Sequence, residues 1–212
     1  MMAKSTSYTE MHRKIRIEKR RRRMRFVLQL LFVILLSALT AAALFSSVLI
    51  QENSMNPTLR AGDRAFVNRL SYVIGGVRRG DLIAYKGKGE FDSGIHVKRV
   101  IGLPGETVQI KDGLILIDGK TYIENRDFPN ISRAGIAENG VRLASGEYFV
   151  LGDNRNNSED SRYQDVGNIS RASIVGKIWF IGTPFSRTGF VSEGRKRYGI
   201  SMVSRTHDEN NP

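Results

Sequence analysis

The longest apolar segment of the chain lies near its N-terminus, over residues 26–50. It contains no charged side chain. The only interruptions are uncharged polar residues, namely Gln29, Ser37, Thr40, Ser46 and Ser47. A helix of this length extends roughly 37 Å, which is enough to cross a hydrocarbon core of ~30 Å with some tilt. We therefore predict one transmembrane helix over residues 26–50.

Two alternatives explain this segment less well. A buried core helix is seldom so long and so evenly apolar. A cleaved signal peptide is compatible with the small residues at 41–43, but a secretory apolar region usually spans only about 7 to 15 residues. Here the apolar sequence continues to Ile50. An uncleaved anchor is the interpretation that the sequence favours.

After residue 51 the chain changes to short β-branched stretches separated by glycine and turn residues, a pattern typical of β-rich domains. The expected strands cover residues 64–68, 81–86, 96–102, 107–111, 114–117, 148–151 and 173–181. Two Asp-Gly pairs, at 112–113 and 118–119, lie between apolar runs and predict tight hairpins. We therefore expect an all-β domain of antiparallel, barrel-like or meander sheets over residues 51–185. A polar tail over 186–212 follows, and residues 198–203 within it have the pattern of an edge strand.

The positive charge of the chain is concentrated before the apolar segment. Of the 33 Lys/Arg, ten lie in the leader over residues 1–25 beside Glu10 and Glu18, which leaves 23 Lys/Arg to face 19 Asp/Glu elsewhere. A nucleic-acid-binding arm is one use for the arginines at 20–23. The adjoining apolar segment favours membrane topology instead, because basic flanks stay cytoplasmic. We expect membrane lipid and no nucleic acid as a partner, with residues from Gln51 onward outside the cytoplasmic membrane.

Metal and thiol chemistry find little support in the sequence. The absence of cysteine excludes disulfides, Cys-ligated metals and a thiol nucleophile. The three histidines, His12, His96 and His207, are too scattered to predict a zinc site. We expect neither a cofactor nor a metal.

A candidate nucleophile lies directly after the predicted membrane segment. Ser54 precedes Pro57, whose ring fixes its own φ and keeps Asn56 out of the helical region. The backbone therefore extends or turns at Ser54, which suits a presented hydroxyl. A serine in such a place often only forms a turn, so the sequence at this point leaves both roles open.

A nucleophilic serine needs a general base, and two side chains are candidates. His96 offers the imidazole of a Ser-His-Asp arrangement. Lys98 offers an amine, but deprotonating a lysine at pH 7 costs ~4.6 kcal/mol in water, so apolar surroundings must destabilise the ammonium. Val97 and Val100, close to Lys98 in the chain, can supply apolar surroundings. A lysine on a solvated strand face is the alternative.

Four motifs follow the apolar segment in order. They are Ser54-Met55-x-Pro57-Thr58-Leu59, Arg79-Gly80-Asp81, the sequence KRVIGLPGE at 98–106 and the sequence GDNRNNSEDSR at 152–162. Together they resemble the successive sequence boxes of bacterial type I signal peptidases, over residues 26–183. The resemblance implies a membrane-bound endopeptidase with an all-β domain at the outer membrane surface. Such an enzyme cuts the signal peptides of exported preproteins after an Ala-x-Ala-like site.

The resemblance also implies roles for individual residues. Ser54 takes the position of the nucleophile and Lys98 that of the neutral general base, which passes the serine proton to the leaving amine. Ser158 takes the position of a hydroxyl that orients the base. Asp160 and Arg162 take the positions of a structural ion pair beside the site, and Asp153 and Arg155 are likewise expected to be structural residues there.

Substrate subsites follow from the same resemblance. One subsite of the family binds the substrate residue just before the cut. The apolar residues that line it correspond here to Ile50, Met55, Leu59 and Val97. Ala65 and Ala84 replace larger residues in the subsite two positions further back. We therefore expect that second pocket to be roomier and to tolerate Val or Leu. His96 shares the strand face of Lys98 and is expected to lie at the rim.

Glu52 departs from the pattern of the family. In some members a serine two residues before the nucleophile donates its hydroxyl to the oxyanion, whereas an ionised glutamate only accepts hydrogen bonds. Two other functions stay open as alternatives. One is a repressor-type self-cleaving Ser-Lys protease, and the other is an anchored, non-catalytic β-domain that binds exported polypeptides.

Overall fold

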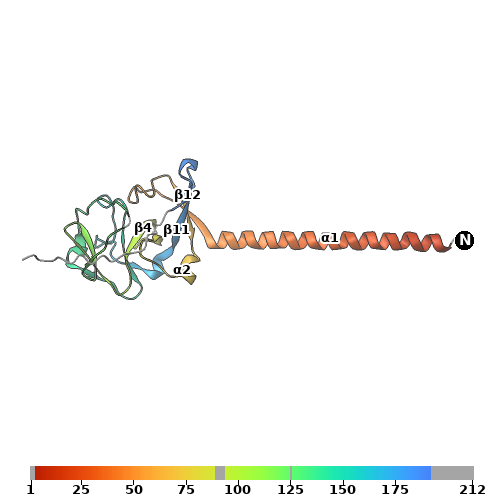
Figure 1. The fold of residues 1–212 in the computed structure, drawn as a ribbon, viewed down its shortest axis with the longest axis horizontal. Coiled ribbons are helices and arrows are strands. Elements are labelled where there is room, and N and C mark those ends of the chain that lie inside the picture. The colour runs from red at the N-terminus through yellow and green to blue at the C-terminus, as the bar shows by residue number, and fades with distance from the viewer. Residues whose placement is uncertain (1–2, 89–93, 125, 192–212) are drawn as a thin grey trace, which may run out of the picture. The chain divides into compact units, whose positions relative to one another are not determined.

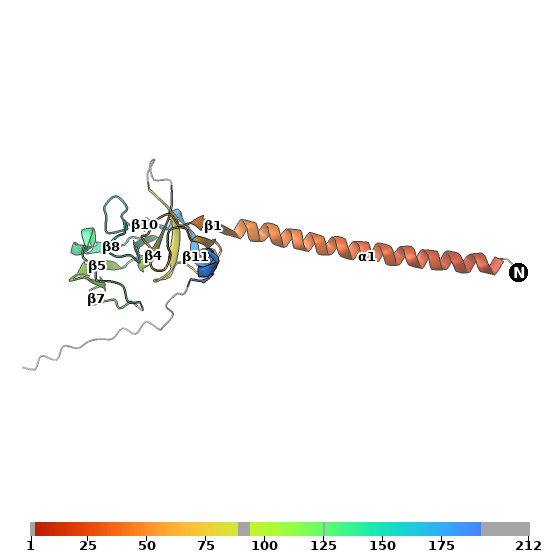
Figure 2. The ribbon, with the colours of Figure 1, turned by 90° about the horizontal axis from the view of Figure 1, so that it is seen from above.

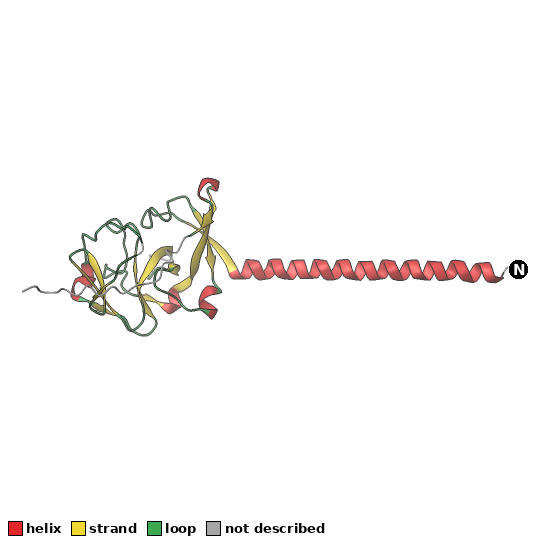
Figure 3. Cartoon of the chain, in the orientation of Figure 1, coloured by secondary structure: helices red, strands yellow, loops and turns green. Residues whose placement is uncertain are grey.

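The computed structural model describes residues 3–88, 94–124 and 126–191. It consists of two compact parts, residues 1–45 and residues 46–212. The first is a helix and the second is built almost entirely of strands and loops (Figure 3). The prediction of antiparallel β-sheets behind one N-terminal apolar helix is confirmed.

The N-terminal helix, α1, spans Ala3–Leu44. Its portion Arg16–Ala41 is long and apolar enough to cross a membrane. The helix ends before the predicted limit at Ile50, because Phe45–Leu49 form strand β1, which pairs with β2 (Arg64–Asn68). Pairing with β2 gives the backbone of β1 the hydrogen-bond partners that a longer helix would have supplied internally. The prediction of helix over 45–50 was therefore wrong.

The larger sheet carries the strands that position the site. Its order is β1-β2-β11-β3-β4-β9-β10, with β12 on β11, among the described residues. Neighbouring strands from β2 to β10 pair antiparallel, and so do β11 and β12. The remaining bounds are β3 Leu82–Lys86, β4 Ile95–Gly102, β9 Glu147–Leu151, β10 Ile169–Ser170, β11 Ile174–Thr183 and β12 Gly189–Phe190. Figure 1 labels β4, β11 and β12 of this sheet.

A smaller sheet has the order β7-β6-β5-β8. Its strands are β5 Thr107–Lys111, β6 Leu114–Ile117, β7 Lys120–Thr121 and β8 Val141–Arg142. Both predicted Asp-Gly hairpins are present, since Asp112 and Asp118 take φ of 53° and 50° and each is followed by a glycine with positive φ. This backbone favours Asp-Gly and matches the twist of paired strands. In Figure 2, β5, β7 and β8 lie together, away from β11.

The seven predicted strands are present, with bounds that differ by at most a few residues. The pattern did not predict the two-residue strands or the short helices α2 Ser71–Ile74, η1 Gly135–Asn139, η2 Arg171–Ser173 and η3 Phe185–Arg187. Such segments are too short to show a period in the sequence. The edge strand expected at 198–203 lies outside the described residues.

Strand β4 is central because three apolar clusters meet along it. Val97 belongs to the cluster of the nucleophile loop, Val100 to a second cluster with Tyr148 and Ile169, and Ile101 to a third that joins the two sheets. From Val97 to Gly102 every residue of the strand is buried. A lysine in the middle of this strand is therefore held away from water.

Candidate active site

Ser54 lies in a turn between β1 and β2. Two backbone hydrogen bonds close the turn, from Asn56 N to Asn53 O at 3.1 Å and from Leu59 N to Met55 O at 2.9 Å. A third joins it to the motif at 152–162, where Asn154 N donates to Ser54 O at 3.0 Å. The serine is thus fixed by its own loop and by a segment about a hundred residues away in sequence.

Lys98 reaches Ser54 from the middle of β4. Its side chain is only 1% exposed, and its Nζ lies 2.7 Å from Ser54 Oγ. In the sheet Lys98 lies opposite Ile83 of β3, with Val97 opposite Ala84. The two candidates for nucleophile and base are therefore in direct hydrogen-bond contact, within the range expected for an activated nucleophile.

Glu52 completes a cluster around this pair. Its Oε2 accepts hydrogen bonds from Ser54 Oγ at 3.2 Å and from Lys98 Nζ at 3.3 Å, and its Oε1 lies 3.3 Å from His96 Nδ1. Burial alone would raise the pKa of the Glu52 carboxyl, but the charge and hydrogen bond of Lys98, with smaller contributions from His96 and Ser54, lower this pKa below its ordinary value. Glu52 is therefore ionised at neutral pH.

The sequence pattern presents Glu52 only as a missing hydroxyl donor, and His96 as an alternative base or a rim residue. The structure brings Glu52 to the Ser54–Lys98 pair and His96 to Glu52. Part of this was visible in the sequence, because residues two apart on a strand share a face. The contact between Glu52 and that face depends on the path of the nucleophile loop, which no local pattern predicts.

Ser158 lies against the nucleophile loop. Its Oγ is buried and has no hydrogen-bond partner among the described residues. A side chain added at Gly152 would meet both Ser158 and the Ser54 carbonyl oxygen, so these three residues are in close contact. A buried hydroxyl without a hydrogen-bond partner costs free energy. The Ser158 hydroxyl beside the nucleophile loop can therefore still form a hydrogen bond.

The close contact at Gly152 predicts the effect of one added methyl group. Gly152→Ala is expected to lower the free energy of unfolding by about 1–3 kcal/mol, because the new Cβ overlaps Ser158 and the backbone of Ser54. Chemical denaturation of the protein in detergent measures this loss. Gly189→Ala is the control, since nothing lies within 4 Å of its Cβ position. Equal stability of the two variants would contradict the prediction.

Asp153 and Arg155 of the predicted scaffold are buried and take partners that the sequence did not indicate. Asp153 accepts from Arg99 Nε and Nη2, both at 2.6 Å, and also from the Thr58 hydroxyl. Arg155 pairs with Glu124 at 2.5 Å. Asp153 and Arg155 therefore hold different neighbours, and Thr58 ties the nucleophile loop to the Asp153–Arg99 pair.

Asp160 and Arg162 pair with each other through two hydrogen bonds between their side chains, at 2.7 Å and 2.8 Å. Asp160 Oδ2 also accepts from Gly152 N at 3.0 Å. Arg162 Nη2 lies 3.4 Å from the Ser158 carbonyl oxygen. This pair fixes the backbone on both sides of Ser158 and touches neither Ser54 nor Lys98 among the described contacts.

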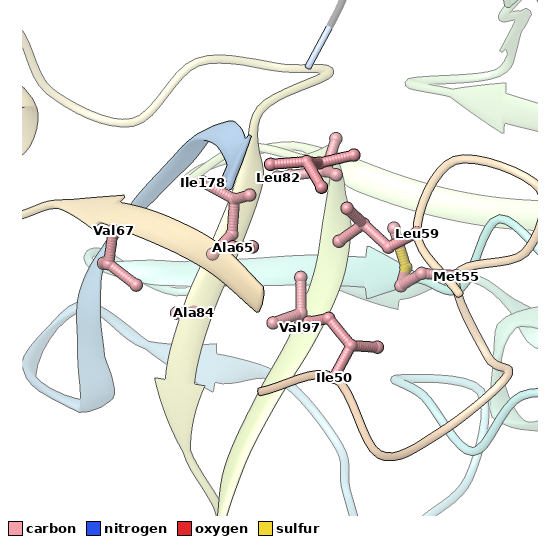
Figure 4. Close-up of a cluster of buried hydrophobic side chains, with 10 residues drawn as sticks. Ile50, Met55, Leu59, Ala65, Val67, Leu82, Ala84, Val97 and Ile178 are labelled. Carbon is pink, nitrogen blue, oxygen red and sulfur yellow. The ribbon is translucent and has the colours of Figure 1, made fainter. Parts of the chain in front are cut away.

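The six residues predicted for substrate subsites all belong to one buried cluster, with Val67, Leu82, Ile178 and Ile181. Figure 4 shows Ile50, Met55 and Leu59 on the loop and Ala65, Ala84 and Val97 on strands. Ala65 and Ala84 are fully buried. The structure thus brings the six together beside Ser54, which Met55 directly follows in the chain.

Two other kinds of site could carry chemistry in the described residues, a cavity and a metal-binding group. A cavity of about 350 Å³ is lined by residues that include Tyr72, Arg78, Asp81 and Lys177, but by neither Ser54 nor Lys98. The described part of the chain contains no group of three His, Asp or Glu side chains able to hold a metal ion. The cluster around Ser54 is therefore the arrangement most suited to chemistry, and what it offers is a hydroxyl beside an amine.

Comparison with known proteins gives a consistent result. The sequence profile described as signal peptidase, peptidase S26, matches residues 23–182. Signal peptidase I T of Bacillus subtilis (strain 168) is 40% identical over 165 residues, 74% of this chain and 83% of that protein. Signal peptidase I of Bacillus licheniformis is 37% identical over 169 residues, 76% of this chain and 89% of that protein. A signal peptidase I crystal structure from Enterococcus faecalis V583 covers 48% of this chain and 95% of that chain, at 33% identity and a TM-score of 0.40.

Proposed function

Because the chain belongs to the signal peptidase family, peptidase S26, we propose that it is a membrane-anchored endopeptidase that removes signal peptides from exported preproteins. In this proposal Ser54 is the nucleophile and Lys98 is the general base. The observation that carries it is the 2.7 Å contact between Lys98 Nζ and Ser54 Oγ, with the lysine almost fully buried.

The reaction proceeds through an acyl-enzyme. A neutral Lys98 amine takes the proton of Ser54 as Oγ attacks the carbonyl carbon of the scissile bond. The resulting ammonium gives that proton to the leaving amine as the peptide bond breaks. Water, activated by the same amine, then releases the signal peptide from Ser54. The 2.7 Å contact between Lys98 Nζ and Ser54 Oγ supports this role, because a general base must lie within hydrogen-bond reach of the proton that it takes.

Two further groups support the reaction. The Ser54 backbone N–H is the proposed oxyanion donor, since Glu52 in its ionised form only accepts hydrogen bonds. Ser158 is the proposed orienting hydroxyl for Lys98. Its buried Oγ without a partner among the described residues supports this role, because such a group is available to the amine once substrate binds.

The proposed topology places the N-terminus in the cytoplasm and residues 51 onward outside. The ten Lys/Arg before the apolar segment support this orientation through the positive-inside rule. The partners are then preprotein signal peptides and membrane lipid. The repressor-type alternative is not supported, because the matched family region, residues 23–182, includes the membrane segment.

The test of this function uses the purified full-length protein in detergent and an exported preprotein whose signal ends in Ala-x-Ala. The expected product begins at the residue after the second alanine, as read by N-terminal sequencing. A Ser54→Ala version of the protein is expected to bind the preprotein and leave it intact. If the parent protein also leaves it intact, the non-catalytic binding domain replaces the proposed enzyme.

The small residues Ala65 and Ala84 predict the substrate preference of the proposed enzyme. Peptides with Val or Leu two positions before the residue at the cut are expected to be cleaved within about tenfold of the alanine peptide, because Ala65 and Ala84 take the positions of larger residues in the subsite that the family resemblance implies. The measurement is kcat/KM over a peptide series. The control is Leu at the cut itself, where cleavage is expected to be lost. Strong preference for Ala at the tested position contradicts the assignment of this pocket.

A further inference from the structure

Glu52 is bonded to both members of the proposed dyad through a single oxygen. Ser54 Oγ and Lys98 Nζ lie 3.2 Å and 3.3 Å from Oε2, while they are 2.7 Å from each other. The Glu52 side chain is 54% exposed, whereas Lys98 is 1% exposed. An acidic side chain at the open edge of the site thus contacts the base and the nucleophile at once.

The direction of these hydrogen bonds matters for catalysis. A carboxylate only accepts, and an ammonium only donates. With Glu52 ionised, the Ser54 hydroxyl donates to Oε2 and accepts from Lys98 Nζ. The reaction requires the opposite direction, with the Ser54 hydroxyl donating to a lone pair on Nζ. Whenever Lys98 is charged, the hydrogen bond between Nζ and Ser54 Oγ must therefore reverse its direction before Ser54 can attack.

The polar groups that contact Glu52 come from one neighbouring strand and from its own loop. β4 contributes Lys98 and His96, and the loop contributes the uncharged Ser54 hydroxyl. From β3, Tyr85 packs on His96 with ring centroids 5.7 Å apart. Of these groups Lys98 has the closest contact with the nucleophile. Burial raises the pKa of Glu52, but Lys98, His96 and Ser54 together lower it below its ordinary value, so its carboxyl carries a negative charge at neutral pH.

We propose that Glu52 is a positioning residue that favours the charged form of Lys98 in the free enzyme and thereby sets the lower pH limit of activity. The sign follows from the charges. A negative carboxylate beside Nζ stabilises the ammonium, so fewer molecules carry the neutral amine at a given pH. Removing the charge of Glu52 extends activity to lower pH. This inference rests on the proposed Ser54–Lys98 mechanism.

The test is the pH dependence of kcat/KM, which reports the groups of the free enzyme. Full-length protein in detergent cleaves one fluorogenic peptide ending in Ala-x-Ala across a range of pH. In Glu52→Gln the amide oxygen still accepts hydrogen bonds, but the charge is gone. The acidic limb of its profile is expected to move down by about one pH unit. This is the lower end of the pKa shift that an opposite charge causes at this distance, because Glu52 is half exposed and water weakens its effect. On that limb the variant then cleaves up to about tenfold faster than the parent.

Two further variants separate charge from structure. Glu52→Ala removes the charge and the acceptor together and is expected to move the limb by the same amount, even if its maximal rate falls. Glu138→Gln removes the same charge at an exposed position of η1 and is expected to leave the limb in place. A limb that stays in place in both Glu52 variants overturns the inference.

Other outcomes are distinguishable from these. If Glu52→Gln loses activity as completely as Lys98→Met at every pH, Glu52 is the base and the inference is again overturned. If the parent protein cleaves nothing, the proposed function fails instead. A parent that cleaves, with an inactive Ser54→Ala and an unmoved limb in both Glu52 variants, retains the function and removes only the role of Glu52.

Discussion

Lys98→Met is expected to reduce signal-peptide cleavage by on the order of 10⁴-fold while the protein stays folded, the upper end of what a general base contributes. Methionine fills most of the space of the buried lysine stem but has no amine within reach of Ser54 Oγ. The hydroxyl then has no group to take its proton as it attacks. Single-turnover cleavage of a preprotein in detergent measures the loss.

Ser54→Ala is expected to give a loss at least as large, because it removes the attacking oxygen. The two residues act as a unit, so the double variant is expected to be no slower than the slower single variant. Lys111→Met, at an exposed position at the end of β5, controls for the loss of a positive charge. Full activity in Lys98→Met, together with loss in His96→Gln, would transfer the role of base to His96.

The second large effect concerns stability. Asp153→Ala is expected to lower the free energy of unfolding by about 3–5 kcal/mol, because it leaves Arg99 charged and buried without its partner. Arg99 loses two hydrogen bonds of 2.6 Å, and the Thr58 hydroxyl loses an acceptor. Urea denaturation in detergent, followed by tryptophan fluorescence, measures the change. Asp165→Ala, an exposed position, is expected to stay within about 0.5 kcal/mol of the parent.

A double variant distinguishes a buried charge from a general loss of packing. Arg99→Met with Asp153→Ala removes both charges, and it is expected to be more stable than Asp153→Ala alone because no unpaired charge remains. If the double variant is less stable than Asp153→Ala alone, the Arg99 stem stabilises the fold mainly by packing. A loss below about 1 kcal/mol in Asp153→Ala would show that water reaches Arg99, since exposed pairs contribute about that much.

Local sequence patterns predict much of the organisation of this protein. The long apolar segment predicts α1, and the Asp-Gly pairs at 112–113 and 118–119 predict two hairpins that form as expected. The sequence motifs of the family are sufficient to indicate Ser54 and Lys98 as the candidate dyad. Each of these features is carried by consecutive residues of one segment or one motif, so its signal is present in the linear chain.

Contacts between distant segments set where the helix gives way to a strand and which charges meet. Phe45–Leu49 is apolar enough for a helix, yet it becomes β1 because β2 offers hydrogen-bond partners. Arg99 pairs with Asp153, which is 54 positions away in the sequence. Arg155 pairs with Glu124, which is 31 positions away. Glu52 meets Lys98 across 46 positions.

The membrane helix, the β-rich domain and the candidate nucleophile and base could thus be predicted from the order of the amino acids. The carboxylate beside that nucleophile and base, and the scaffold pairs Arg99–Asp153 and Arg155–Glu124, emerge from the folded domain. They could not be predicted because charge pairing has no period along the chain. Its partners are set by sheet register and by the path of loops, and both arise from the packing of the whole domain.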